Sequence, residues 1–207
     1  MSNVTLYRHP LSGHSHRVQL LLSILNVDAE IIDVDLKSGA HKQDTFLEKN
    51  PLGQVPVLEV DDLHIYDSNA ILTYIAAKYD DSGSWLPRDP ATQASIQQIL
   101  TVAAGPLAYG PARARLITVF GAGYDAATTI AQAHTLLASL ELRLNNSEWI
   151  SASHPTIADI ALYSYVAHAP EGNVSLASYH NIRDWLARIE DLPGFVPMTK
   201  TAVGLAA

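Results

Sequence analysis

The hydrophobic and polar positions in the first 80 residues alternate between two periods. Short runs with the two-residue period of strands cover residues 4–7, 30–35, 55–60 and 64–66. Apolar residues at helical spacing precede Asn26, and shorter helical patterns cover residues 45–49 and 69–79. Ser68 is the expected N-cap of the last of these helices, because its hydroxyl can accept a free backbone N–H. The pattern predicts the order β-α-β-α-β-β-α.

The connections predict how these strands pair. The last two strands are separated only by a turn at Asp61 and Asp62, so we expect an antiparallel hairpin. The earlier strands are joined through helices, which is typical of parallel pairs. The sequence therefore predicts a small mixed sheet with helices on it.

The rest of the chain has a helical period. Asp, Ser, Gly and Pro mark residues 81–92 as a linker, and a bent or broken helix is expected at Gly110-Pro111. No strand pattern stands out after the linker. We expect a first domain over residues 1–80 and an all-helical domain over residues 93–207, with helices at 91–104, 125–145, 156–169 and 182–190.

Composition narrows the class of protein. Of 207 residues, 48% are hydrophobic and 16% are charged, which excludes a disordered chain. No apolar run is long enough for a membrane span, and no secretory signal is visible, so a cytoplasmic protein is expected. The net charge of −8 argues against a nucleic-acid partner. Without cysteine, any thiol chemistry must use a thiol carried by a ligand.

The turn after the first strand is the first candidate site. It places Ser12 before a helix, beside free backbone N–H groups and the positive end of the helix dipole. Such a corner stabilises an anion, either a phosphate or a thiolate. The alternative is that Ser12 or Ser15 only caps the helix.

Two further segments can bind parts of a peptide-like ligand. A cis bond between Val55 and Pro56 would turn the Val55 backbone outward, where it could pair with an extended ligand, whereas a trans bond would indicate only an edge strand. Asp67 and Ser68 stand at a helix start, where they can hold the ammonium and the carboxylate of an amino-acid group. Plain capping is the alternative for this pair.

Three motifs together resemble those of the glutathione S-transferase family, in particular its serine-type, bacterial-like cytosolic members. They are Asn50-Pro51-x-Gly53-x-Val55-Pro56, Asp67-Ser68-x-Ala70-Ile71 and the capping box at 156–159, which we assign to folding. The resemblance covers the whole chain. It implies a thioredoxin-like N-terminal domain, an all-α C-terminal domain, a homodimer, and glutathione as co-substrate for small hydrophobic electrophiles.

The resemblance also implies roles for single residues. Ser12 occupies the place of the thiolate-stabilising hydroxyl, with Tyr7 as the rival and His14 as a further catalytic alternative. The glutathione-binding residues it implies are His41, Lys42, Gln54, Val55, Pro56, Asp67 and Ser68. Asp67 replaces the Glu that is more usual in the family, which shortens its reach.

The free energies of the available contacts are large enough for a hydroxyl to stabilise the thiolate without a general base. A thiol with a pKa of about 8.5 needs roughly 2.7 kcal/mol of stabilisation to reach about 6.5. A hydrogen bond to a charged group supplies about 1.5–3 kcal/mol, and a helix N-terminus adds about 0.3–1 kcal/mol. Ser12 would donate its hydrogen bond to the sulfur and not remove a proton.

The remaining chemistry is less specific. Tyr109 and Arg113 are expected to form a polar part of an otherwise apolar electrophile site, or simply to pack or face water. His14 or His16 could assist the thiolate as a cation, or could simply lie on the surface or pack. A metal at His9, His14 and His16 is not expected, since no carboxylate clusters there. Glutathione-dependent reduction or isomerisation, and ligand carriage without catalysis, remain alternatives.

Overall fold

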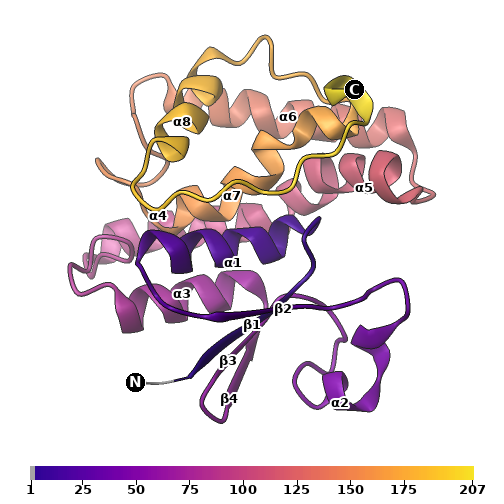
Figure 1. The fold of residues 1–207 in the computed structure, drawn as a ribbon. Coiled ribbons are helices and arrows are strands. Elements are labelled where there is room, and N and C mark those ends of the chain that lie inside the picture. The colour runs from indigo at the N-terminus through magenta and orange to yellow at the C-terminus, as the bar shows by residue number, and fades with distance from the viewer. Residues whose placement is uncertain (1–2) are drawn as a thin grey trace.

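The computed structural model describes residues 3–207, and Figure 1 shows a sheet layer below a layer of helices. The sheet has four strands in the order β2-β1-β3-β4. The strands are β1 (Val4–Arg8), β2 (Glu30–Asp33), β3 (Val57–Val60) and β4 (Leu63–Tyr66). The helices between them are α1 (Gly13–Ile24), a short turn η1 (Ala40–Lys42), α2 (Asp44–Leu47) and α3 (Ser68–Tyr79). The predicted element order is confirmed.

One predicted strand direction is wrong. β1 and β2 are parallel and β3 and β4 form the antiparallel hairpin, as expected, but β3 runs antiparallel to β1. Val57, at the start of β3, pairs with Tyr7 near the end of β1. The four-residue helix α2 lies beside the carboxyl ends of β1 and β2 and does not cross back over the sheet (Figure 1). The chain therefore enters β3 at the same end of the sheet at which it left β2, so β3 runs opposite to β1 and β2.

The predicted N-cap of α3 is also wrong by one residue. Asp67, with φ 68°, caps the helix, and its Oδ1 accepts from the N–H groups of Asn69 and Ala70 at 2.9 and 3.0 Å. A carboxylate matches the positive helix end better than a hydroxyl does. Ser68 thus lies inside the first turn of the helix, and its hydroxyl is free for other partners.

The second half of the chain is helical. Its α-helices are α4 (Pro90–Ala104), α5 (Arg113–Phe120), α6 (Ala126–Leu144), α7 (Ile157–Ala167) and α8 (His180–Glu190). A π-helical segment η2 (Ala108–Ala112) leads into α5, and short 3-10 turns η3 (Ala169–Gly172) and η4 (Gly204–Ala206) follow later. The chain is not broken at Gly110-Pro111, where a bent or broken helix was expected; α4 ends at Ala104, and both residues lie in the irregular π-helical segment η2.

Helix α7 is the centre of the hydrophobic core. Residues 157–166 are all buried, and the helix packs against α1, α3, α4 and α8. Its N-terminus carries the expected capping box, in which the Thr156 N–H donates to Asp159 Oδ2 at 2.9 Å. The other Asp159 oxygen accepts from Ile150 N–H and Trp185 Nε1, both at 2.9 Å. Burial raises the pKa of Asp159, and these donors counter that effect.

The expected linker is not a loose tether. Trp85 is buried, and its carbonyl accepts from the N–H of Ile157 at 3.0 Å. The segment is thus packed against the start of α7, and α4 begins at Pro90, inside the range expected for the linker. The division into domains at residues 80 and 93 stays a prediction.

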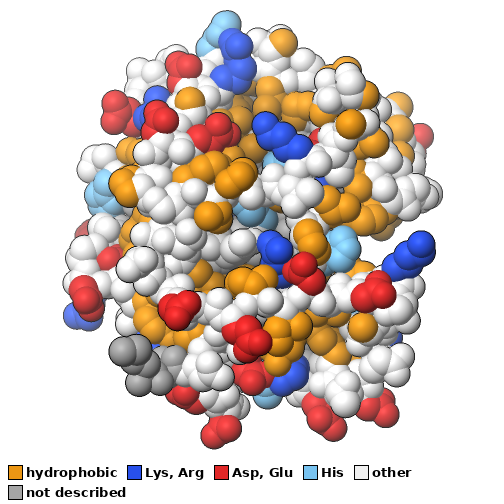
Figure 2. Space-filling model, in the orientation of Figure 1, with side chains coloured by type: hydrophobic (Ala, Val, Ile, Leu, Met, Phe, Trp, Pro, Cys, Tyr) orange, Lys and Arg blue, Asp and Glu red, His pale blue; other side chains and the backbone are white. Residues whose placement is uncertain are grey.

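The outer surface carries mixed charge. On the face shown in Figure 2, acidic and basic side chains are scattered among hydrophobic ones. Within residues 3–207, no helix is both long and apolar enough to cross a membrane.

Replacing Asp159 tests the role of the capping box in folding. Asp159→Ala removes the acceptor of three buried N–H groups and of the Thr156 hydroxyl. An unpaired donor costs about 1–3 kcal/mol, so we expect the free energy of unfolding to fall by at least about 3 kcal/mol. Asp125→Ala is the matched control, since Asp125 caps the exposed start of α6 through Thr128. It should cost only about 1 kcal/mol. Urea unfolding measures both, and equal losses would contradict this role.

Candidate functional site

The turn between β1 and α1 presents the Ser12 hydroxyl at a helix start. The Ser12 N–H donates to the His9 carbonyl at 2.9 Å, which closes the turn. Ser12 Oγ accepts from the N–H of Ser15 at 3.2 Å, so Ser12 is the N-cap of α1. That contact uses an oxygen lone pair and leaves the hydroxyl proton free to be donated. Capping and anion stabilisation are therefore compatible here.

Helix α1 begins unusually close to α7. A Cβ at Gly13 would lie 2.8 Å from the ring of Tyr165, so only glycine fits without displacing that ring. The same ring packs edge-on against His14, with 5.1 Å between centroids. The start of α1 is thus fitted against the buried helix.

His14 connects α1 to α3. Its Nδ1 lies 3.1 Å from Ser68 Oγ. Burial, with a smaller contribution from the charge of Arg17, lowers the pKa of His14 to about 3. The imidazole is therefore neutral at physiological pH, and the expectation of a cationic histidine at this position is wrong. His16 is also neutral, because burial lowers its pKa to about 4.

Arg17 is a site residue that the sequence analysis missed. It is fully buried, and its Nη1 donates to Asn69 Oδ1 at 2.9 Å and to Ser68 Oγ at 3.3 Å. Burial lowers the pKa of Arg17 to about 10, so the group keeps its charge at neutral pH. Its signal in the sequence is a positive charge directly before the apolar positions Val18 and Leu20 of α1.

The loop before β3 has the expected conformation. The peptide bond between Val55 and Pro56 is cis. Within residues 3–207, neither the N–H nor the C=O of Val55 makes a hydrogen bond. Gly53 has φ 57°, and a Cβ there would lie 2.7 Å from the His41 carbonyl. Glycine therefore lets this loop approach η1 closely.

Two hollows meet at the start of α1. The first hollow lies between the loop before β3 and the start of α3, and its lining residues are His14, Asn50, Leu52, Gln54, Val55, Pro56, Tyr66, Asp67 and Ser68. The second hollow opens toward η1, and its lining residues are His14, Leu36, His41, Lys42, Gly53, Gln54 and Val55. His14, Gln54 and Val55 border both. The two hollows therefore form one elongated site, with Asp67 at one end and Lys42 at the other.

The structure gathers all seven residues expected to bind glutathione around these hollows. Lys42 Nζ donates to the carbonyls of Leu52 and Gly53 at 3.2 and 2.9 Å, which ties η1 to the loop. Asn50, Leu52 and Tyr66 also line the first hollow and were not named from the sequence as contacts. Asn50 stood within the motif that carried the resemblance, which was the available signal.

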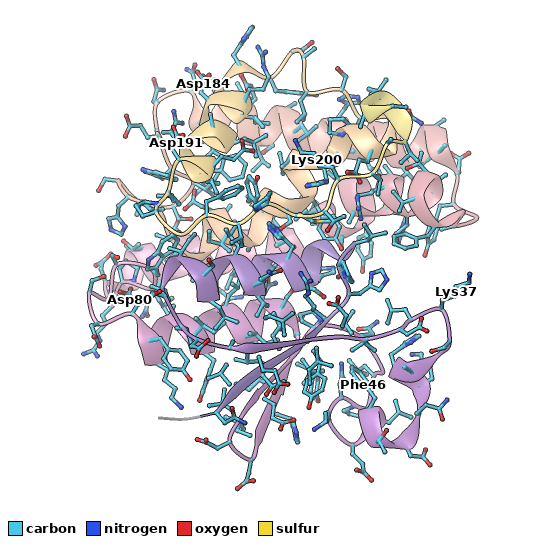
Figure 3. All side chains as sticks on the ribbon, in the orientation of Figure 1. Lys37, Phe46, Asp80, Asp184, Asp191 and Lys200 are labelled. Atoms are coloured by element: carbon cyan, nitrogen blue, oxygen red, sulfur yellow. The ribbon has the colours of Figure 1, made fainter. Side chains whose placement is uncertain are left out.

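The Tyr7 side chain lies on the face of the sheet that packs against α2, not on the face that α1 and α3 cover. Its ring packs edge-on against Phe46, 6.4 Å between centroids, and Figure 3 labels Phe46 beside α2. The Tyr7 hydroxyl donates to Glu59 Oε2 at 3.1 Å. Burial and the Glu59 carboxylate raise the pKa of Tyr7. The hydroxyl is thus committed to Glu59, away from both hollows.

Tyr109 and Arg113 lie apart from the hollows, at the start of α5. The Arg113 guanidinium sits between two rings, 4.8 Å from the centroid of Tyr109 and 4.5 Å from that of Tyr124. Phe120, the last residue of α5, is exposed, and its ring centroid lies 6.2 Å from that of His9. The side chains of Tyr109, Arg113 and Phe120 therefore form an aromatic strip of α5 that ends beside the Ser12 turn.

The three histidines near the turn have separate partners. His9 Nδ1 accepts from Leu11 N–H, His14 contacts Ser68, and His16 contacts Ser164 and the Val196 carbonyl. In the part of the chain that the structure describes, no three metal-binding side chains gather.

Known proteins have similar sequences and folds. Residues 2–77 match the family described as glutathione S-transferase, N-terminal domain. Glutathione S-transferase 3 of Zea mays is 31% identical over 94% of this chain and 92% of its own. A glutathione S-transferase structure from Pseudomonas fluorescens superposes with a TM-score of 0.89 at 30% identity, covering 95% of this chain and 99% of that one. A Drosophila mojavensis homologue with bound glutathione has a TM-score of 0.86 at 26% identity, covering 93% and 90%.

The protonation of His14 can be measured directly. We expect its imidazole to stay neutral between pH 8 and about pH 5, because burial disfavours the charged form. Nitrogen chemical shifts of the ring report this state in a pH titration by NMR. The same chain unfolded in urea is the control, and its histidines should titrate with a pKa of about 6.5. A folded-state midpoint near 6.5 for His14 would refute the assignment.

Proposed function

Because the chain belongs to the glutathione S-transferase family, we propose that it binds glutathione along the two hollows and transfers its sulfur to small hydrophobic electrophiles. The observation that carries this proposal is the continuity of the two hollows through His14, Gln54 and Val55. An extended tripeptide with a charged group at each end and a thiol in its middle fits such a site.

The chemistry of the two ends supports an orientation for glutathione. In the first hollow, the start of α3 and the Ser68 hydroxyl suit the carboxylate of the γ-glutamyl group, and the second Asp67 oxygen suits its ammonium. At the other end, His41 and Lys42 suit the glycyl carboxylate. The unpaired backbone of Val55 lies between them and can pair with the cysteinyl residue.

Sulfur activation falls to the start of α1. Ser12 donates a hydrogen bond to the thiolate, and the helix N-terminus adds its positive potential. The bond to sulfur forms as the leaving group departs from the electrophile, and the thiol proton goes to solvent. Tyr7 is disfavoured by its bond to Glu59. A neutral His14 can act only as a hydrogen-bonding group.

The electrophile lies between this turn and the aromatic strip of α5 that runs from Tyr109 and Arg113 to Phe120. The exposed rings suit an apolar substrate, and Arg113 adds a polar group. A homodimer in the cytoplasm, with no metal, nucleic acid or membrane partner, completes the proposal, which rests on the family.

Replacing Ser12 tests the activation step. Ser12→Ala should lower kcat for conjugation of an aromatic electrophile by at least about tenfold, since a hydrogen bond to a charged atom is worth about 1.5–3 kcal/mol. Glutathione affinity should stay within a few-fold, because the binding groups lie in the hollows. Tyr7→Phe is the comparison, and a larger fall in kcat there would reverse the choice.

Replacing Ser68 tests the glutamyl assignment. Ser68→Ala should weaken glutathione binding by about 1–3 kcal/mol, the cost of an unpaired partner. Thr73→Ala is a matched control on α3, because the Thr73 hydroxyl is exposed and bonds only to Asn69 O. Calorimetric titration with glutathione measures both. Unchanged affinity in Ser68→Ala would show that the γ-glutamyl group binds elsewhere.

A further inference from the structure

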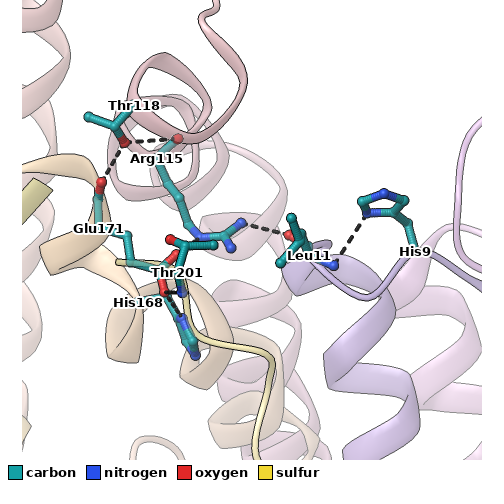
Figure 4. A network of polar contacts seen from close by, with 7 residues as sticks. All are labelled: His9, Leu11, Arg115, Thr118, His168, Glu171 and Thr201. Atoms are coloured by element: carbon teal, nitrogen blue, oxygen red, sulfur yellow. Dashed lines mark hydrogen bonds and ion pairs between the residues drawn. The ribbon is translucent and has the colours of Figure 1, made fainter. Parts of the chain in front are cut away.

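A buried ion pair in the helical half of the chain reaches the turn that carries Ser12. Arg115 in α5 and Glu171 in η3 are each 2% exposed, and Arg115 Nε donates to Glu171 Oε2 at 2.6 Å. Figure 4 shows this pair within a network that extends to Leu11 and His9. Burying two charges is costly even when they pair, so the pair is weak evidence for stability alone.

Glu171 holds the arginine in one orientation. Its other oxygen accepts from His168 Nδ1 at 2.7 Å and from the Thr201 N–H at 3.0 Å. Burial on its own raises the pKa of Glu171, but the hydrogen bonds from Thr201, His168 and Arg115 outweigh it and lower the pKa to about 2. The carboxylate is therefore ionised at neutral pH. The Thr118 hydroxyl binds the Glu171 carbonyl as well.

The free end of the guanidinium contacts the first half of the chain. Arg115 Nη1 donates to the Leu11 carbonyl at 2.6 Å, across 104 positions of sequence. That carbonyl and the Ser12 N–H belong to one peptide group, and the N–H donates to His9 O at 2.9 Å. Because a peptide group is planar, holding both of its polar atoms fixes its orientation. The orientation of this group determines where the Ser12 side chain points.

Apart from the bond to Arg115, the hydrogen bonds of residues 9–12 stay within residues 9–16. The Leu11 N–H donates to His9 Nδ1 at 3.3 Å, and the His9 N–H donates to Ser15 Oγ at 3.3 Å. A turn held by local bonds opens more easily than one anchored to a buried group. The glutathione-binding residues lie in the two hollows, and neither Leu11 nor Arg115 lines them.

We infer that Arg115, oriented by Glu171, is a positioning residue that fixes the Leu11–Ser12 peptide group so that the Ser12 hydroxyl is directed at the sulfur of glutathione. This inference rests on the role proposed above for Ser12. It assigns the helical half of the chain a part in activating the thiol, in addition to holding the electrophile.

Two variants loosen the contact without removing a side chain. Arg115→Lys keeps the charge, but a single ammonium lacks the planar fork that reaches both Glu171 and Leu11. Glu171→Gln keeps the shape and removes the charge that orients Arg115. We expect each to lower kcat at least about tenfold and to raise the pKa of the bound thiol by about one unit toward 8.5, with the Kd of glutathione within about threefold.

Arg143→Lys is the matched control. Arg143 Nε also donates to a backbone carbonyl at 2.6 Å, that of Ile150, but within the helical half alone. Its kcat and thiol pKa should match those of the wild type. Thermal unfolding of all variants shows which are folded, and Glu171→Gln carries the test if Arg115→Lys does not fold.

A double-mutant cycle decides whether Arg115 acts through Ser12. In the Ser12→Ala background, Arg115→Lys should change kcat by less than about twofold, because the hydroxyl it positions is gone. A full additional loss, an unchanged thiol pKa in the single variants, or a fall in glutathione affinity that matches the fall in kcat would overturn the inference. If Ser12→Ala itself left kcat unchanged, the proposed role of Ser12 and this inference would both fail.

Discussion

Two buried guanidinium groups fix the two ends of the functional turn. Arg17 ties α1 to Ser68 and Asn69 at the start of α3, and Arg115 ties the Leu11 carbonyl to η3. The turn between these ends is short and polar, so apolar packing alone cannot hold it. Arg115 uses two nitrogens of its planar fork, Nε for Glu171 and Nη1 for Leu11, whereas Arg17 reaches both of its partners through Nη1.

The hydrophobic core places these anchors where they can act. Helix α7 is buried from Ile157 to Val166 and packs against α1 and α3 of the first half and against α4 and α8 of the helical half. Tyr165 of α7 contacts His14 and lies within 5.9 Å of the Arg17 guanidinium. The capping box at Thr156 and Asp159 fixes where α7 begins. A folding motif at one end of α7 thereby helps to position Tyr165, near its other end, against the start of α1.

The sequence predicted the order of the elements, since periodicity and capping are local, and the family resemblance pointed to seven residues that line the two hollows. It failed where long-range geometry decided the outcome. The direction of β3 depends on α2 staying at one end of the sheet. Whether Asp67 or Ser68 caps α3 depends on the backbone conformation of Asp67. The partner of Arg115 lies 56 positions away and that of Leu11 lies 104 positions away, so no local pattern could reveal their contacts.

The histidines show the same limit. Their presence in the turn suggested that one of them could act as a cation, but burial keeps His14 and His16 neutral. Positive potential at the turn therefore comes from the N-terminus of α1 and from the buried arginines. A sequence gives the residue types, whereas the charge that each carries follows from its surroundings in the folded chain.

The central claim is that the start of α1 stabilises a thiolate. The most direct test is a pH titration of the ultraviolet absorbance of the thiolate in the complex of the unmodified protein with glutathione, without any electrophile. The account predicts a thiol pKa of about 6.5, well below the value of about 8.5 for a free thiol. A bound thiol that titrates near 8.5 would contradict it.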